Sequence, residues 1–439
     1  MGIGNIIFII ILLAAIILFA LNCKKIAANI KLGKKLDRSD RKSDRLNLML
    51  KVAIGQSKMV KRPVAGILHI IVYAGFVIIN IEVLEILIDG IFGTHRVFAF
   101  LGKFYYFLIA AFEYLALGVL VACLIFLIRR NVLRIKRFHK PEMKHWPTTD
   151  ANLILITEIL LMSAFLIMNA SDTALQIKGH YHYTKVGTFP ISGWFVNAFS
   201  GVSESSLIAI ESGTWWFHII GILGFLNYLP YSKHFHILLA FPNVYYSKLT
   251  PKGQLDNLEA VKKEVELMFD PSADPYAAPA PTETPPERFG AKDVLDLNWK
   301  QLMEAYTCTE CGRCTSVCPA NLTGKKLSPR KIMMDTRDRI EEVGDNIRKN
   351  GKFLEDNKSL IRDYITEEEV LACTTCNACA EACPVNIDPV SIIIDLRRYL
   401  IMEESKAPNE WTMMLTNIEN NGAPWQFAQN DRLNWKNEA

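Results

Sequence analysis

Five segments of the chain are apolar over nearly twenty consecutive positions, and polar stretches separate them. A helix needs about 20 apolar residues to cross a hydrocarbon core about 30 Å thick. We therefore expect five membrane-spanning helices, at about residues 3–21, 64–88, 104–128, 152–170 and 213–230. The first segment has no positive charge before it and no small-residue cleavage site after it. We interpret it as a retained span rather than a signal peptide.

The polar stretches between these segments differ in charge. Residues 22–63 carry thirteen Lys or Arg against three Asp, and residues 129–150 carry seven basic residues against two acidic ones. Residues 89–103 have only two basic residues, and residues 171–212 have two basic against three acidic. Positively charged loops stay on the cytoplasmic side of the inner membrane. We therefore expect the N-terminus outside and everything after the fifth span in the cytoplasm.

The pattern changes again after the fifth span. Residues 254–269 read as an amphipathic surface helix, and residues 270–288 combine six prolines with small and polar residues, which predicts a semi-extended spacer. From about residue 292 the composition is that of an ordinary soluble domain. The expected organisation is a membrane domain, a connecting helix and linker, a soluble domain and a tail, at residues 1–248, 249–291, 292–405 and 406–439.

Eight of the ten cysteines form two runs with the same spacing, CTECGRCTSVCP at 308–319 and CTTCNACAEACP at 373–384. Both obey C-x2-C-x2-C-x3-C-P, and four soft thiolates so close together can wrap an iron–sulfur cluster. Structural zinc is the main alternative, but zinc modules usually place a long gap between two C-x2-C pairs. We expect two [4Fe–4S] clusters, held by reduced thiolates in the cytoplasm.

Three histidines within or next to the spans suggest haem. A buried imidazole in lipid is costly without a partner, and a haem iron held by two histidines is such a partner. His69 and His236 both lie near the cytoplasmic face and can share one haem b. His218 would lie about 27 Å from His236 along a continuous helix. A second haem would therefore need an outer ligand, for which His95 is the candidate.

Other histidines offer alternatives. His180 and His182 are further outer candidates, and His234 could replace His236, although it points the other way on a helix. The competing interpretation is that all of these are interfacial histidines that are hydrogen-bonded to the backbone.

Carboxylic acids inside the spans are candidates for exchanging protons with a quinone. Intramembrane acids often have a function, and the candidates here are Glu82 and Glu113, with Glu85 and Glu158 also within spans. The alternative is a protonated acid that is hydrogen-bonded between helices.

Residues 60–248 resemble the gamma subunit of respiratory nitrate reductase, a five-helix haem b protein that reacts with quinol. The likeness rests on the five-span plan, on His69, on the spacing from His218 to His236, and on LPYSKHFHILLAFP after the fifth span. The family has a second histidine ten residues after the first, where this sequence has Ile79. The resemblance therefore implies the cytoplasm-side haem more strongly than the outer one.

Residues 292–405 resemble the cluster-bearing small subunit of heterodisulfide reductase and the similar domain of succinate dehydrogenase. Helical patterns fill the 54 residues between Cys318 and Cys373, and each run is followed by Ser-Pro or Asp-Pro and a matching helix, IMMDTR or IIIDLR. The resemblance implies an all-helical ferredoxin fold in which the fourth cysteine of each run crosses to the other cluster. The implied sets are Cys308, Cys311, Cys314 and Cys383 for one cluster, and Cys373, Cys376, Cys379 and Cys318 for the other.

The sequence contains redox-cofactor motifs and, apart from a quinone pocket, no evident place for substrate chemistry. It has no G-x-G-x-x-G after a strand, no P-loop and no C-C-G module. We therefore expect a peripheral partner subunit with a flavin or a cysteine-rich CCG-type catalytic module, and no nucleic acid partner.

The fold class expected is all-α, a five-span bundle followed by a helical ferredoxin domain. The expected function is that of an electron-transfer subunit of a quinone-linked oxidoreductase in the inner membrane, with quinone as substrate. The alternative is a membrane-tethered iron–sulfur scaffold or redox sensor without quinone turnover.

Overall fold

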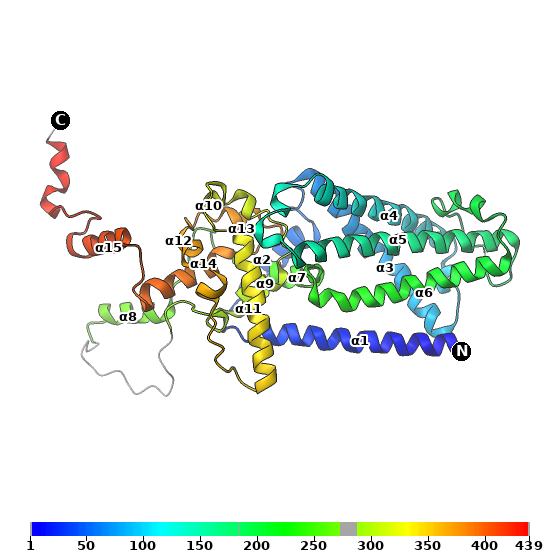
Figure 1. Cartoon of the computed structure of the whole chain (residues 1–439), viewed down its shortest axis with the longest axis horizontal. Coiled ribbons are helices and arrows are strands. Elements are labelled where there is room, and N and C mark those ends of the chain that lie inside the picture. The colour runs from blue at the N-terminus through cyan, green and yellow to red at the C-terminus, as the bar shows by residue number, and fades with distance from the viewer. Residues whose placement is uncertain (1, 184, 273–287, 438–439) are drawn as a thin grey trace.

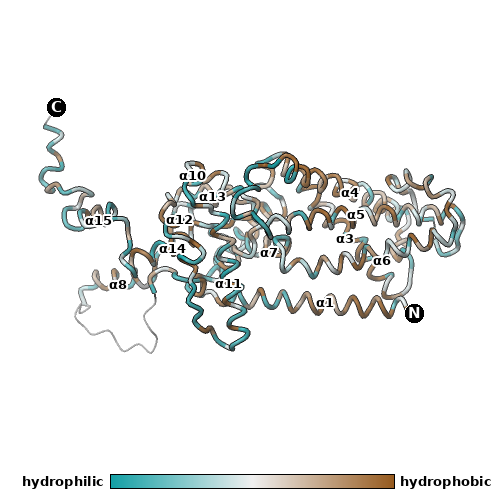
Figure 2. Tube along the Cα trace, in the orientation of Figure 1, coloured by the Kyte–Doolittle hydropathy of each residue, from teal (hydrophilic) through white to brown (hydrophobic). Residues whose placement is uncertain are grey.

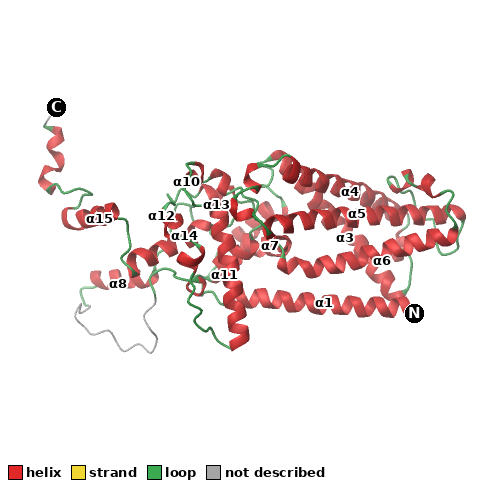
Figure 3. Cartoon of the chain, viewed as in Figure 1, coloured by secondary structure: helices red, strands yellow, loops and turns green. Residues whose placement is uncertain are grey.

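The computed structural model describes the whole chain except residues 1, 184, 273–287 and 438–439. Every regular element in the described residues is a helix, and no strand occurs among them (Figure 3). Two isolated bridges pair Lys34 with Asn298 and Ile361 with Ile365. The described part of the chain agrees with the expected helical fold class.

Five helices are long and apolar enough to cross a membrane, as the hydropathy pattern predicts. They are α1 (Ile3–Ile30), α3 (Pro63–Phe92), α4 (Lys103–Leu127), α5 (Trp146–Lys178) and α6 (Glu204–Tyr228). They run side by side as a bundle, and their traces are mostly hydrophobic (Figures 1 and 2). The 30 residues of α3 are about 45 Å long at 1.5 Å per residue, so this helix extends beyond the apolar core of a bilayer.

Small residues bring neighbouring helices of the bundle close together. A Cβ atom added at Gly75 of α3 would collide with Val119 of α4, and one added at Gly221 of α6 would collide with Leu161 of α5. Close backbone approach is the usual source of packing energy between helices in lipid, where hydrophobic burial gives little. These glycines therefore help to set the α3–α4 and α5–α6 pairs.

The fifth long helix ends before the histidine that the sequence places on it. α6 stops at Tyr228, and two short 3-10 turns separate it from α7 (His236–Tyr245). Pro230 has no backbone N–H and disfavours a helical residue before it. The expectation of one continuous helix from His218 to His236 is therefore wrong, because the two histidines lie on separate helices.

A second group of helices follows the bundle and packs around its own apolar core. This C-terminal helical region (residues 292–405) buries side chains such as Leu302, Ile332 and Leu396. Its helices are α9 (Trp299–Thr307), α10 (Pro319–Leu322), α11 (Pro329–Asn350), α12 (Glu367–Leu371), α13 (Ala378–Ala382) and α14 (Pro389–Arg398).

Each cysteine run is followed by a capped helix, as the internal repeat predicts. Ser328 accepts a hydrogen bond from the backbone N–H of Lys331 at the start of α11. Asp388 accepts one from the N–H of Val390 at the start of α14. A proline occupies the first turn of both helices, where its missing N–H would have no helical partner anyway. Both helices therefore begin at a defined point after the cysteines.

Besides α7, the described helices α2 (Lys42–Met49), α8 (Glu259–Phe269) and α15 (Asn409–Asn421) lie outside these two groups. α2 precedes α3, and α8 covers most of the predicted amphipathic helix. Most of the predicted proline-rich spacer lies outside the described residues. The tail contains α15, which extends away from the rest of the molecule and whose residues are all at least partly exposed (Figure 1).

The C-terminal helical region sits directly on one end of the bundle (Figure 1). Asn29, near the end of α1, donates a hydrogen bond from Nδ2 to the Tyr306 hydroxyl at 2.8 Å. Glu142, between α4 and α5, accepts one from Nη2 of the fully buried Arg330 at 2.7 Å. Buried polar contacts of this kind are directional, so they define how the two groups of helices are oriented.

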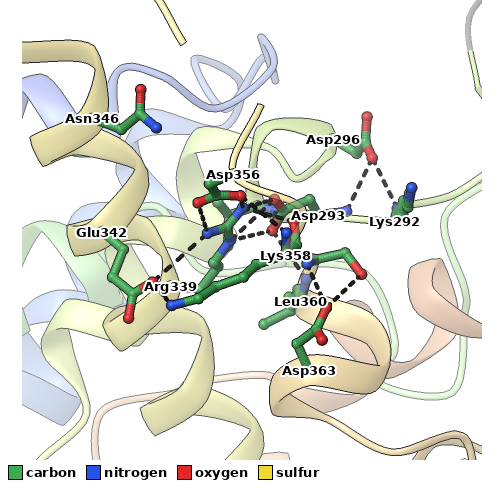
Figure 4. Close-up of polar contacts among 12 residues, drawn as sticks. Lys292, Asp293, Asp296, Arg339, Glu342, Asn346, Asp356, Lys358, Leu360 and Asp363 are labelled. Carbon is green, nitrogen blue, oxygen red and sulfur yellow. Dashed lines mark hydrogen bonds and ion pairs between the residues drawn. The ribbon is translucent and has the colours of Figure 1, made fainter. Parts of the chain in front are cut away.

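An ion-pair network ties together the first and middle segments of this region (Figure 4). The Arg339 guanidinium is fully buried and donates to Asp293 Oδ2 at 2.6 Å and to Asp356 Oδ2 at 2.5 Å. It also donates to the Lys358 carbonyl at 2.9 Å. Burial opposes the charge, but the two carboxylates outweigh it and raise the pKa of Arg339. The network holds α11 against the loop that precedes the second cysteine run.

Candidate electron-transfer site

The two cysteine runs adopt the same unusual backbone. Glu310 and Thr375, each two residues after the first cysteine of its run, have φ angles of 54° and 55°. Gly312 and Asn377, each four residues after that cysteine, have φ angles of 68° and 58°. Left-handed conformations are uncommon for residues other than glycine. Their recurrence at matching positions shows that both runs curl in the same way.

The fold brings the last cysteine of each run to the other run. Cys383 shares a small cavity with Cys308, Cys311 and Cys314, and it interacts electrostatically with each of them. Cys318 interacts in the same way with two thiols of the second run, those of Cys373 and Cys379. Cys379 of the second run also lines the small cavity, and the crossed ligand sets that the ferredoxin resemblance implies stay a prediction.

The cysteines are free thiols, and those of the first set gather around a small space. All ten cysteines, each within the described residues, are free thiols. Within the described ranges, no three Cys, His, Asp or Glu side chains converge closely enough to hold one metal ion. The first set instead surrounds a space of about 20 Å³. Soft thiolates at this spacing are the usual ligands of iron–sulfur clusters.

Burial also affects the protonation of these thiols. It raises the pKa of Cys308 to about 12 and the pKa of Cys383 to about 11. A thiol must lose its proton to become a metal ligand, so cluster binding at this set has to displace protons.

The two sets differ in what they face. Cys376 of the second set is exposed at the surface. Cys311 of the first set instead lines a larger cavity that reaches into the bundle, together with Thr309, Arg313 and Val385. Cys376 therefore faces the surroundings of the molecule, and Cys311 faces the cavity among the membrane helices.

The larger cavity has a volume of about 460 Å³ and lies among α3, α4, α5, α6 and the start of α7. Most of its lining is apolar, with Val72, Ile79 and Leu155 among the side chains. Four histidines also line it, at positions 69, 218, 234 and 236. Apolar walls with a few placed polar groups are typical of cofactor sites.

His69 and His236 face each other across one end of this cavity. Their ring centroids are 6.5 Å apart. Two imidazoles that bind one metal through bonds of about 2.0 Å have ring centroids about 6 Å apart. The Nδ1–H of His236 donates to the Lys233 carbonyl at 3.1 Å, which leaves Nε2 free to bind a metal. The pair therefore fits a haem, which His69 and His236 would hold through one ring nitrogen each.

His234 lies beside this pair rather than facing away from it. Its ring centroid is 5.5 Å from that of His236, and it lines the same cavity. The expectation that it points away assumed a regular helix, but residues 233–235 form a 3-10 turn.

The structure does not bring His218 and His95 together. The Nδ1–H of His218 donates to the Leu161 carbonyl at 3.0 Å. His95 Nε2 instead lies 3.7 Å from Asp172. Asp172 is eleven residues after Leu161 on α5, which corresponds to about 16 Å along the helix at 1.5 Å per residue. A second haem between these two histidines has no geometric basis, because their partners on α5 are so far apart.

The other outer candidates lie near His95. The ring centroid of His182 is 5.2 Å from that of His95, and His180 Nε2 lies 3.6 Å from the Glu204 carboxylate. These three histidines belong to loops at the end of the bundle far from the cysteines.

The predicted quinone-site acids have structural partners or lie off the cavity. Glu113 accepts hydrogen bonds from the backbone N–H groups of Ile191 and Ser192 at 2.8 and 3.2 Å, so it anchors that loop. Glu82 Oε2 is buried without a hydrogen-bond partner among the described residues. Of the acids within the spans, the described cavity lining includes Glu158 but neither Glu82 nor Glu113.

One residue that sequence reasoning missed joins the histidine pair to the first cysteine run. The Lys233 carbonyl orients His236, while its ammonium group pairs with Glu310 and lies 3.8 Å from Asp150. Arg337 also pairs with Glu310, at 2.9 Å. Burial would raise the pKa of Glu310, but these two cations outweigh it and lower that pKa. No local signal reveals this contact, because Lys233 and Glu310 are 77 residues apart.

Comparisons with known proteins bear on both halves of the chain. A family described as the 4Fe-4S dicluster domain matches residues 307–387. The chain is 30% identical to the probable iron-sulfur-binding oxidoreductase FadF of Bacillus subtilis, over 98% of this chain and 60% of that protein. It is 24% identical to the EtfAB:quinone oxidoreductase of Syntrophomonas wolfei, over 92% of this chain and 55% of that protein.

A further relative matches a shorter stretch. One component of the dihydromethanophenazine:CoB–CoM heterodisulfide reductase of Methanosarcina mazei is 31% identical over 33% of this chain and 35% of that protein. No solved structure matches. The chain thus spans a little over half the length of the first two relatives. These matches confirm a two-cluster iron–sulfur domain and a likeness to iron–sulfur oxidoreductases, while the likeness to the nitrate reductase gamma subunit stays a prediction.

Proposed function

We propose that this chain is the electron-transfer part of a membrane-bound iron–sulfur oxidoreductase. In this proposal, electrons pass between a cytoplasmic partner and the membrane quinone pool through two [4Fe–4S] clusters and one haem b. The clusters use the two crossed cysteine sets, and the haem uses His69 and His236. These groups, when bound, supply one-electron transfer steps.

The observation that carries the proposal is the shared cavity. Cys311 of the first cysteine set lines the same space as His69 and His236. A cluster and a haem bound at these residues would be neighbours with no helix between them. A membrane-tethered iron–sulfur protein without a transmembrane function would not need a cavity that joins its cysteines to buried histidines.

The chain's own residues hold this arrangement in place. Lys233 orients His236 through its carbonyl and holds the first cysteine loop through its pair with Glu310. Arg313 donates to the Lys58 carbonyl at 3.1 Å, so it joins the cysteine loop to the segment before α3. A shift of either loop would therefore change the spacing between the two redox sites.

Electrons enter or leave at the other cysteine set. Cys376 is exposed, and a soluble partner can approach the cluster there. The partner would be of the EtfAB type named for the Syntrophomonas relative, or a subunit with a flavin or a CCG-type module. The excess of Lys and Arg in residues 22–63 and 129–150 supports a cytoplasmic position for this surface, with the N-terminus outside.

The test uses the purified full-length protein. We expect about one haem b and eight cluster irons per chain, and quinol that reduces the haem in the absence of a soluble partner. His69→Leu and His236→Leu should each remove the haem absorption and leave the cluster irons unchanged, because leucine cannot bind the haem iron. His145→Asn is the control, because His145 is exposed and does not line the described part of the cavity.

The outcomes separate the proposal from its alternative. Cluster irons without haem in the wild-type protein would contradict the quinone relay and favour a membrane-tethered scaffold or redox sensor. Loss of haem from the His145→Asn control as well would contradict the assignment of His69 and His236.

A further inference from the structure

The large cavity extends beyond the His69–His236 pair to a second polar end. His218 on α6 and Glu158 on α5 both line it there, among apolar neighbours that include Ile79, Cys123 and Met162. Glu158 lies three residues before Leu161, whose carbonyl accepts the hydrogen bond from His218. Residues three apart lie on the same face of a helix, so Glu158 lies within one turn of the point where His218 contacts α5.

The hydrogen bond of His218 defines which nitrogen is available. A carbonyl oxygen can only accept, so Nδ1 of His218 carries a proton that it donates to Leu161 at 3.0 Å. Nε2 of the neutral ring is then a free acceptor. This atom is buried and has no hydrogen-bond partner in the part of the chain that the structure describes, and the side chain is only 1% exposed. Such an atom is costly to bury unless a ligand supplies the missing partner.

The Glu158 carboxyl is similarly available. In the described residues it makes no hydrogen bond or ion pair, unlike Glu113 and Glu85, which are held by backbone and hydroxyl donors. Ionisable groups inside spans usually mark a pathway or a ligand site. The cavity end therefore offers one proton-accepting nitrogen and one carboxyl group.

This cavity reaches the lipid-facing surface of the bundle. Phe76 and Val77 of α3 line it and are nevertheless 45% and 52% exposed. Asn80, one turn further along α3, also lines it and is exposed, with its side-chain amide bonded to the Phe76 carbonyl. An apolar molecule that is dissolved in the bilayer can therefore enter between these side chains without crossing an aqueous phase.

We propose that this end of the cavity, between His218 and Glu158, binds the head group of a membrane quinone. The inference rests on the proposed function, which includes exchange of electrons with quinone, and it specifies where the quinone binds. In quinol oxidation the two O–H bonds break, His218 Nε2 accepts one proton and the Glu158 carboxylate accepts the other. The two electrons leave singly to the redox groups held by His69, His236 and the cysteines, and quinone reduction is the reverse.

The geometry favours a quinone over a second haem at His218. A second haem needs another ligand across the cavity, as His69 stands across from His236. The position on α3 ten residues after His69 is Ile79, which lines the cavity with an aliphatic side chain. His95, the ligand expected from the sequence, lies beside Asp172 instead.

The test measures binding of an alkyl hydroxyquinoline N-oxide, an unreactive quinol analogue whose fluorescence is quenched when it binds. It uses the full-length protein in lipid nanodiscs, with haem and iron determined for every variant. We expect saturable quenching at about one site per chain. His218→Gln and Glu158→Gln should each weaken binding about tenfold or more, because each loses a buried hydrogen-bonding partner. Haem and cluster iron should stay at wild-type levels.

Glu82→Gln is the matched control. Glu82 is also a buried acid of the spans with an unpartnered oxygen, but it does not line the described part of the cavity. The dissociation constant of the Glu82→Gln variant for the N-oxide should stay within about twofold of the wild-type value. Unchanged binding in both His218→Gln and Glu158→Gln would overturn the site, as would loss of half the haem from His218→Gln, which would make His218 a haem ligand. A wild-type protein without haem would contradict the proposed function instead.

Discussion

Arg339 illustrates how much of the stability of the C-terminal helical region depends on one side chain. It has no exposed surface, and it faces Asp293 and Asp356. Asp293 in turn accepts hydrogen bonds from the backbone N–H groups of Val294 and Leu360, at 2.8 and 3.1 Å. Arg339→Met would therefore leave two carboxylates without their partner and loosen two backbone segments.

We expect Arg339→Met to lower the free energy of unfolding by about 3 kcal/mol, since removal of one partner of a buried ion pair is strongly destabilising. The midpoint of thermal unfolding of the full-length protein, followed by circular dichroism, measures this. Arg432→Met, in the exposed tail, should leave the midpoint unchanged. Equal midpoints for the two variants would contradict the role of the network.

Lys233 gives a second prediction at this scale. Its positive charge pairs with Glu310, next to Cys311. Lys233→Met removes the positive charge and leaves the negative charge of the Glu310 carboxylate beside the first cluster, with Arg337 as its remaining partner. The reduction potential of that cluster should fall by on the order of 50 mV, as expected for a unit charge about 10 Å away in a medium with an effective dielectric constant of about 20.

A redox titration monitored by electron paramagnetic resonance separates the two clusters. The second cluster should be unaffected, and Lys233→Arg should restore the potential of the first. Equal shifts at both clusters would show a general change of fold rather than a local charge effect.

Residue-level prediction from the sequence worked where covalent spacing decides the answer. Cysteines at intervals of three, three and four positions must lie on one loop, so the two runs were identifiable. The contact between Lys233 and Glu310 depends on how two distant segments pack, and nothing within either segment indicates it. His218 was recognised as a functional candidate, but its partner depended on the same kind of packing.

At the scale of elements, Gly344 controls how closely α11 approaches α1. A Cβ atom at this position would collide with the Asn29 side chain, which is buried and hydrogen-bonded to Tyr306. We expect Gly344→Val to destabilise the protein by about 1–3 kcal/mol, which is typical of overpacking. It should also loosen the seating of the C-terminal helical region on the bundle.

Thermal unfolding and limited proteolysis of the full-length protein test this. Asn29→Ala combined with Gly344→Val should recover part of the lost stability, because the smaller side chain leaves room for valine. Gly4→Ala is the control, since a Cβ atom there meets nothing within 4 Å. The steric explanation would be contradicted if the double variant lost as much stability as the two single variants together.

Element-level prediction succeeded for the spans and for the two capped helices after the cysteine runs. Apolar length and local capping residues determine those features. It failed after the fifth span, where we expected one continuous helix from His218 to His236 although Pro230 disfavours a continuing helix. The break between α6 and α7 also explains why the distance of about 27 Å from His218 to His236, calculated along one helix, does not apply.

At the scale of the whole molecule, the two ends of the bundle have different chemistry. The end that carries the cysteines is flanked by residues 22–63 and 129–150, with thirteen and seven basic residues. The opposite end has few, and its buried Arg96 is paired with Asp172 at 2.7 Å, so that charge is neutralised within the protein. The basic residues are therefore concentrated at the end of the bundle that carries the cysteines.

This asymmetry leads to the last prediction. Alkaline phosphatase folds actively only outside the cytoplasm, so fusions of it report which side of the membrane a loop occupies. A fusion after residue 187, in the loop between α5 and α6, should be active. Fusions after residue 136, between α4 and α5, and after residue 405 should be inactive. An active fusion after residue 405 would place the clusters outside, where exposed thiols are oxidised, and the exchange of electrons with a cytoplasmic partner would then be impossible.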